Sequence, residues 1–175
     1  MSDQGSPEDP STASNPEPNN PEAISDEALL ARFVNSTNAP PSSKLLGFRL
    51  TGLSQKDKWV EALFTASPTL ANPMGQVQGG YLTAMLDEVM SVAGLVASGM
   101  TCVMPTLEMK TSFLRPAVAD GGEIRGVGRI LRWGKTIAFT EGELFDPQRR
   151  LLAKATGTAL PTPFARFKSE KPSAP

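Results

Sequence analysis

The alternation of hydrophobic and polar residues divides the chain into a few helical and extended segments. From a glycine pair at 79–80 to residue 99, apolar residues follow one another with few polar interruptions, which predicts one long buried helix. A shorter amphipathic helix is predicted over 25–36, where Ser25 is the expected N-cap. Strands are predicted wherever apolar runs end in turn residues: 44–54, 57–67, 103–114, 123–132, 136–145 and 151–160.

The order of these segments predicts the fold class. A short helix and two strands precede the long helix, and four strands follow it. The strands are joined by short turns such as "WGK" and "DPQRR", so neighbouring strands are expected to run antiparallel. One long central helix against an antiparallel sheet of five to six strands is an α+β architecture.

Composition separates a central domain from two tails. Residues 1–24 are acidic and Pro-rich with almost no apolar side chains, so we expect a disordered tail. Residues 25–160 suit a single domain, and 161–175 are expected to form a flexible C-terminal tail. The first segment has neither the apolar region of a secretory signal nor the Arg-rich character of a transit peptide. We therefore expect a cytoplasmic protein that does not enter a membrane.

The distribution of charge favours a small anionic ligand over nucleic acid. The chain has 18 acidic and 17 basic residues, but seven of the acids and none of the bases lie in residues 1–27. The remainder carries a net charge of +6, which suits a ligand with several phosphates. It has no run of basic residues and no motif typical of nucleic-acid binding.

Two rare residue types restrict the possible chemistry. The chain contains no histidine, which excludes Ser-His-Asp and Cys-His catalysis and histidine metal ligands, and no metal is expected. Its single cysteine, Cys102, lies among apolar residues and is interpreted as a buried structural thiol. Catalysis without a cofactor would then depend on carboxylates, hydroxyls, amides and the backbone.

Two adjacent carboxylates interrupt the long apolar helix. On a helical wheel Asp87 lies opposite the apolar face predicted to pack on the sheet, which comprises Leu82, Met85, Val89, Val92 and Val96. Small residues surround Asp87 on its own face: Thr83, Ala84, Ser91, Gly94 and Ser98. Such a stripe allows a second backbone or a slender ligand to come close. Asp87 is therefore a candidate catalytic group, although a plain solvent-facing acid is the alternative, and Glu88 is interpreted mainly as a charge at the rim.

The glycine pair at the head of this helix is a candidate anion-stabilising site. The first amides of a helix have no acceptor inside it, and at Gly79 and Gly80 no side chain shields them. The alternative is a tight loop-to-helix turn. Gly79 and Asp87 are about 12 Å apart along a helix, so one chain cannot bring both to one carbonyl group. If they cooperate, two helices from two subunits must run antiparallel along their small-residue stripes.

Several segments resemble the hotdog-fold acyl-CoA thioesterases of the phenylacetyl-CoA and 4-hydroxybenzoyl-CoA type. They are "NPMGQVQGG" followed six residues later by Asp87, then "PTLEMKTSFLRPA", "GKTIAFTEGELFD" and "LLAKATGTAL". The resemblance implies a homodimer or dimer of dimers that hydrolyses acyl-CoA without a further cofactor. In that interpretation Asp87 attacks the thioester or activates water, and Gly79 of the facing subunit polarises the carbonyl. Asn72 orients water or the acid, while Ser91 and Thr106 supply hydroxyl groups or only pack.

One residue departs from the pattern of the family. Members usually have histidine before the glycine pair, whereas this chain has Gln78, which cannot carry a proton charge near neutral pH. A dimer that binds an acyl-CoA without turning it over is therefore the alternative function. Gly80 is expected to contact the substrate, and Arg132 and Lys135 are candidates for the phosphates of CoA.

Overall fold

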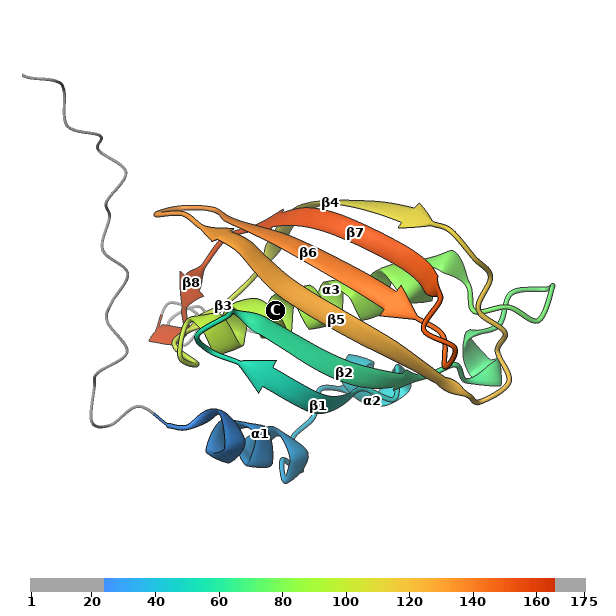
Figure 1. The fold of residues 1–175 in the computed structure, drawn as a ribbon, viewed down its shortest axis with the longest axis horizontal. Helices are drawn as coiled ribbons and strands as arrows, with labels where there is room; N and C mark the ends of the chain where they lie inside the picture. Colours follow the sequence, from blue (N-terminus) through green and yellow to red (C-terminus); the bar gives the residue numbers. More distant parts are fainter. Residues whose placement is uncertain (1–23, 166–175) are drawn as a thin grey trace, which may run out of the picture.

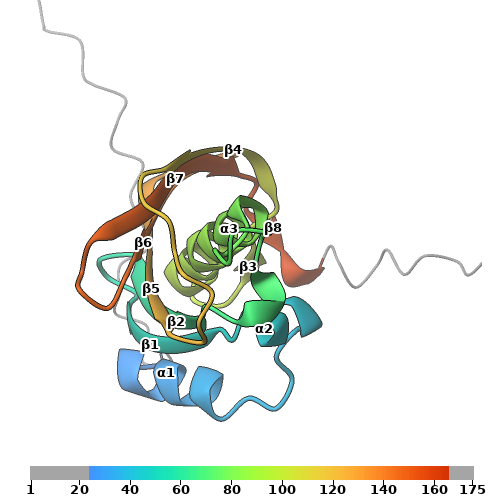
Figure 2. The ribbon, with the colours of Figure 1, turned by 90° about the vertical axis from the view of Figure 1, so that its right-hand side faces the viewer.

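The computed structural model describes residues 24–165, in which a curved sheet wraps around a long helix (Figures 1 and 2). The predicted tails 1–23 and 166–175 lie outside the described residues. The helical elements are α1 (Asp26–Val34), α2 (Pro41–Leu45), η1 (Pro68–Leu70) and α3 (Gly79–Ala97). The strands are β1 (Arg49–Ser54), β2 (Trp59–Thr65), β3 (Cys102–Val103), β4 (Thr106–Phe113), β5 (Glu123–Trp133), β6 (Ala138–Phe145), β7 (Leu151–Ala159) and β8 (Thr162–Pro163).

The main sheet has six strands in the order β1-β2-β5-β6-β7-β4, and every neighbouring pair is antiparallel. The predicted α+β architecture with one central helix is therefore confirmed. The edges of the sheet are β1 and β4, and α1 packs outside β1 (Figures 1 and 2). The buried Leu29 anchors α1, whose N-cap Ser25 accepts a hydrogen bond from the Ala28 amide as expected.

Apart from shifts of one or two residues, three boundaries differ from the prediction, and proline explains two of them. The strand predicted from residue 44 begins only at Arg49, because Pro41 occupies the first turn of α2. The strand predicted over 103–114 is split into β3 and β4 at Pro105, which has no backbone N–H to donate. Towards the C-terminus, Thr162–Pro163 pairs with Cys102–Val103, so residues 162–163 of the expected tail belong to a small second sheet.

Glycine in the strands allows α3 to rest directly on the sheet. A Cβ atom added at Gly128 would collide with the backbone carbonyl of Val89 on α3. Added Cβ atoms at Gly142 and Gly157 would each lie 2.9 Å from the Met90 side chain. Since real Cβ atoms do not approach other atoms this closely, only glycine permits the observed spacing between helix and sheet.

The buried face of α3 is wider than the helical wheel predicted. Leu82, Met85, Val89 and Val96 are buried as expected, whereas Val92 is only partly buried. Residues on the neighbouring side of the helix are also buried in the core: Leu86, Met90, Ala93 and Gly94. The prediction that Gly94 belongs to an open stripe is wrong, because the Met104 side chain of the same chain fills the space beside it.

By length and composition, α3 is apolar enough to cross a membrane. A buried core helix passes the same test, and α3 is the central helix of this fold. Residues 24–165 contain no other helix that meets the criterion.

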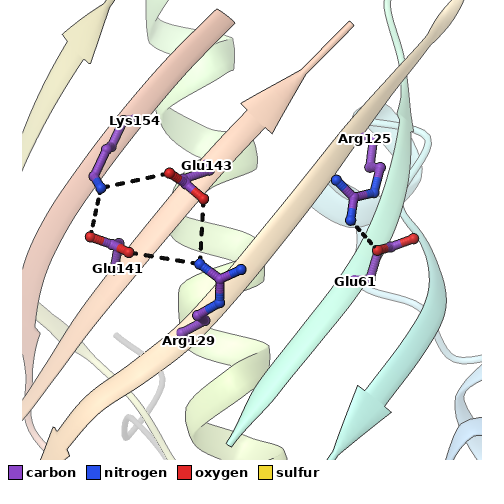
Figure 3. Close-up of polar contacts among 6 residues, drawn as sticks. All are labelled: Glu61, Arg125, Arg129, Glu141, Glu143 and Lys154. Carbon is purple, nitrogen blue, oxygen red and sulfur yellow. Dashed lines mark hydrogen bonds and ion pairs between the residues drawn. The ribbon is translucent and has the colours of Figure 1, made fainter. Parts of the chain in front are cut away.

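The outer face of the sheet carries a ladder of alternating charges (Figure 3). Lys154 on β7 lies 2.8 Å from Glu141 and 3.6 Å from Glu143 on β6, and Arg129 on β5 contacts the same two carboxylates. The hydrogen bond to Glu141 outweighs desolvation and raises the pKa of Lys154. These charges neutralise one another across three strands and face away from α3.

Candidate active site

Asp87 meets a hydroxyl group from the edge of the sheet. Thr106, the first residue of β4, donates a hydrogen bond of 2.6 Å from Oγ1 to Oδ1 of Asp87 on α3. One carboxylate oxygen is thereby fixed and Oδ2 stays available to a ligand or a water molecule. Asp87 and Thr106 therefore form a hydrogen-bonded pair. They are 19 residues apart in the sequence, and both were predicted as site residues.

The other predicted residues of this helix face have different environments. Ser91 lies one turn beyond Asp87 and is partly buried, without a side-chain hydrogen bond to any residue in 24–165. Glu88 is not the rim charge that the sequence suggested. Its Oε1 accepts a hydrogen bond of 2.6 Å from Ser43 on α2, and Ser43 is only 2% exposed. Glu88 thus ties α2 to α3, whereas Asp87 ties β4 to α3.

The head of α3 presents free backbone donors. Gln78 is the N-cap and its carbonyl accepts from the amides of Tyr81 and Leu82. Within residues 24–165, the amides of Gly79 and Gly80 have no acceptor, as expected for the first turn of a helix. Gly80 is exposed, and a Cβ atom added there would meet nothing within 4 Å.

The side-chain oxygen of Asn72 stabilises the loop before α3. Oδ1 of Asn72 accepts hydrogen bonds from the amides of Met74 (2.9 Å) and Gln76 (3.1 Å). The Nδ2 group, which can only donate, remains for the site. Gln78 is exposed, and its backbone N–H donates a hydrogen bond to the Leu70 carbonyl. Its side chain makes no hydrogen bond that caps the helix.

A hollow of 410 Å³ lies beside the head of α3. It is lined in part by Asn72, Gly79, Leu82 and Phe113. A Cβ atom at Gly79 would lie 3.2 Å from Cζ of Phe113, so the aromatic ring rests against this glycine. Phe113 was not predicted as a site residue. The alternation of the strand could have indicated it, because Met109, Thr111 and Phe113 follow one another at two-residue spacing on the helix-facing side of β4.

The strand β4 connects two separate parts of the candidate site. Its first residue contacts Asp87, and its last residue contacts Gly79. Eight residues of strand span about 24 Å, and Gly79 and Asp87 are about 12 Å apart along α3. Within one chain the carboxylate and the free amides are therefore at different places, in agreement with the geometry expected from the helix alone.

The predicted phosphate ligands lie at the hairpin between β5 and β6. Arg132 and Lys135 are both exposed and form no ion pair with any residue in 24–165. The pairings Thr106–Ala159, Ala159–Ala138 and Ala138–Trp133 place this hairpin at the same end of the sheet as Thr106, across four strands. Four strands span about 14 Å. The part of the chain that the structure describes contains no cluster of three or more Cys, Asp or Glu residues that could hold a metal.

Comparison with known proteins agrees with this architecture. The sequence model of the thioesterase superfamily matches residues 74–153, which include α3, the strands from β3 to β6 and the start of β7. A curated Thermoplasma volcanium protein, named for a proposed esterase activity, is 30% identical over 81 residues, which are 46% of this chain. The chain spans 59% of the length of that relative.

Solved structures give fuller coverage. A phenylacetic acid degradation-related protein of Ralstonia eutropha, described as a proposed thioesterase, is 31% identical with a TM-score of 0.64, over 75% of this chain and 98% of that one. The E. coli PaaI protein from the phenylacetic acid degradation operon has a TM-score of 0.61 at 19% identity, over 68% and 86% of the two chains. The second likeness concerns the fold alone. On the family match and the fully covered Ralstonia relative, the chain belongs to the thioesterase superfamily, with the hotdog fold of its PaaI-like members.

Proposed function

We propose that this protein is a thioesterase that hydrolyses an acyl-CoA to the free acid and CoA. The observation that carries the proposal is the hydrogen bond from Thr106 to Asp87, which orients a carboxylate in a chain that has no histidine. A carboxylate held by one oxygen can act through the other as a general base or as a nucleophile. The amides at the head of α3 supply donors for the oxygen that becomes negative.

A second subunit would bring these two parts together through β4. This strand is an edge of the sheet, so its outer row of backbone groups is free to pair with another strand. Leu107 and Phe113 on it are 55% and 54% exposed, and Oγ1 of Thr111 is buried without a partner among the described residues. If two copies of β4 pair antiparallel about their centre, Thr106 of one subunit lies opposite Phe113 of the other. Asp87 of one subunit then approaches Gly79 of its partner.

The reaction follows from this arrangement. Asp87 removes a proton from a water molecule, whose oxygen attacks the thioester carbonyl carbon. The carbonyl oxygen becomes negative and accepts a hydrogen bond from the Gly79 amide of the facing subunit. The C–S bond then breaks, and the CoA sulfur takes the proton held by Asp87. If Asp87 attacks directly, the same bond breaks and water hydrolyses the resulting anhydride.

The remaining site residues have supporting roles in this proposal. The Nδ2 group of Asn72 orients water or the substrate, and Gly80 leaves room for the thioester. Arg132 and Lys135 bind phosphates of CoA, because both cations are exposed and form no ion pair within residues 24–165. The dimer, the tetramer built from two dimers, and the cytoplasmic location remain predictions.

The test is release of free thiol from a panel of short, medium, long and aryl CoA esters. Asp87→Asn should lower kcat by about 100-fold or more while the protein stays folded. Glu88→Gln is the matched control, because the amide oxygen still accepts the hydrogen bond from Ser43 and kcat should change little. Unchanged kcat in Asp87→Asn would exclude the role proposed for Asp87.

Gln78 favours the second candidate, a dimer that binds an acyl-CoA without hydrolysis. Its exposed side chain stands where members with this motif usually have histidine. Tight binding of CoA esters, without release of thiol from any member of the panel, would establish that function instead.

A further inference from the structure

Two hairpins meet at one end of the sheet. Figure 1 shows the turn between β1 and β2 and the turn between β5 and β6 at the same, left-hand end of the molecule. The amide of Ile130 donates a hydrogen bond of 3.0 Å to the Lys58 carbonyl, so the two hairpins are in direct contact. This surface, made by residues 54–59 and 131–139, is called the hairpin end.

The hairpin end exposes large apolar side chains. Three of them are more than a third exposed: Leu131 (57%), Ile137 (37%) and Phe139 (45%). On β6, Phe139 alternates with buried residues that face α3, so it points to the outer side of the sheet. A register shift after Ile130 places Leu131 in a bulge of β5. Single exposed apolar residues are common, whereas three in one hairpin are typical of an interaction surface.

Both tryptophans of the chain lie at this end of the sheet. Trp59 is the first residue of β2 and Trp133 is the last residue of β5, and each is partly buried. The indole ring is apolar but carries one N–H donor, and tryptophan is enriched at the boundary between lipid and water in membrane proteins. The position of the two rings therefore suits contact with a lipid surface.

The hairpin end is positively charged. Four cations there form no ion pair within residues 24–165: Lys56, Lys58, Arg132 and Lys135. Two acids contact the turn between β1 and β2. Asp57 accepts a hydrogen bond from the Ser54 hydroxyl, and Asp26 on α1 accepts hydrogen bonds from Gln55. Four cations against two acids complement the negative surface of a membrane that contains anionic lipids.

From the apolar side chains, the tryptophans and the positive charge, we propose that the hairpin end binds the surface of a membrane that contains anionic phospholipids. Leu131, Ile137 and Phe139 enter the boundary between headgroups and acyl chains, while the cations contact the headgroups. Contact with the surface does not require α3 to leave the core. This property goes beyond the proposed hydrolysis and does not depend on it.

The experiment measures binding of the full chain to vesicles of phosphatidylserine and phosphatidylcholine in equal parts, by sedimentation and by tryptophan fluorescence. The wild type should bind these vesicles with a shift of its emission to shorter wavelength, and it should bind pure phosphatidylcholine about tenfold more weakly. Because Arg132 and Lys135 are also proposed to bind CoA, the apolar residues carry the test. Phe139→Ser and Leu131→Ser should each weaken binding by about fivefold.

The chain offers matched controls at the far ends of β5 and β6. Val118→Ser is the apolar control, because Val118 is 61% exposed and precedes the start of β5. Arg149→Gln is the control for charge, since Arg149 is exposed in the turn between β6 and β7. Lys135→Gln should weaken binding about fivefold, whereas both controls should bind like the wild type.

If a hairpin variant does not fold, quenching of the wild-type tryptophans by brominated lipids tests the same contact. A wild type that does not bind the mixed vesicles, or whose tryptophans are not quenched, overturns the inference. Equal weakening by Lys135→Gln and Arg149→Gln does so too, because it indicates attraction by overall charge. Self-association that Phe139→Ser abolishes, without vesicle binding, would identify a second copy as the occupant instead. Vesicle binding is measured without a thioester, so its absence would leave the proposed hydrolysis standing.

Discussion

Thr106 Oγ1 and Asp87 Oδ1 are 2.6 Å apart, and this hydrogen bond joins the edge strand β4 to the middle of the central helix. It fixes both the rotamer of the carboxylate and the distance of β4 from α3. The position of the candidate catalytic group is therefore set by an element that also forms the exposed edge of the sheet.

Loss of the Thr106 hydroxyl should impair turnover more than folding. In Thr106→Val the carboxylate loses a charge-assisted hydrogen bond, so kcat should fall by about 10- to 100-fold. Steady-state thiol release measures this effect. Thr106→Ser keeps the donor and should recover most of the activity, whereas equal losses in both variants would indicate that the methyl group matters more than the hydrogen bond.

Mixed dimers should reveal whether the site contains residues of two subunits. Asp87→Asn removes the base, and Gly79→Pro removes the amide hydrogen at the first position of α3, where proline is tolerated. Because the proline ring also adds a Cβ atom close to Phe113, Gly79→Ala, which adds that atom and keeps the amide, is the control. Asp87→Asn and Gly79→Pro should each be inactive alone. After denaturation and refolding together in equal amounts, about a quarter of the wild-type activity should return, because half of the dimers would hold one intact site.

Mixtures that stay inactive, although both variants are folded and dimeric, would contradict the shared site. Activity of Gly79→Pro by itself would show that the Gly79 amide is not the required donor.

The bond between Ser43 and Glu88 should contribute to stability. Ser43→Ala leaves a partly buried carboxylate without its donor, so the free energy of unfolding should decrease by about 1.5–3 kcal/mol. Urea denaturation measures the change. A double-mutant cycle with Glu88→Leu, which removes the acceptor, separates this bond from the loss of packing, and a decrease below about 0.5 kcal/mol would show that the bond adds little.

Gly128 should tolerate no side chain. In Gly128→Ala the new methyl group would collide with the Val89 carbonyl, and the free energy of unfolding should fall by more than about 3 kcal/mol. Gly80→Ala is the control for stability, since open space surrounds that position and a change below about 1 kcal/mol is expected. Equal stability of the two variants would mean that α3 can move away from the sheet.

The charge ladder predicts that the stability of the folded state changes with pH in the alkaline range. The raised pKa of Lys154 means that its ion pairs stabilise the folded state below the unfolded-state pKa and lose this effect as the pH rises through the folded-state value. Lys154→Gln should thus cost less than about 1 kcal/mol near neutral pH, because the pairs are partly exposed. The difference from wild type should shrink as the pH rises beyond the ordinary lysine pKa and through the raised folded-state value. A difference that persists there would point to packing of the aliphatic chain.

The sequence was sufficient for the order of the long helix and the main strands, whereas the pairing of Asp87 with Thr106 was not predicted from it. Periodicity predicted α3 and most strands, and the resemblance named both residues before their contact was known. Contacts such as that of Ser43 with Glu88, 45 residues apart, could not be predicted, because they depend on how α2 folds back over α3. The same holds for Phe113 on Gly79. The glycines of β5, β6 and β7 could have indicated a close backbone approach, but only the structure shows that Val89 is the neighbour.

The glycines of β5, β6 and β7 let α3 rest directly on the sheet, and at those positions no space remains between helix and strands. The proposed thioester substrate is accordingly expected on the outside of the folded unit, along the side of α3 that the sheet does not cover. If the proposed function holds, substitutions along that outer side should change the acyl preference without repacking the interior.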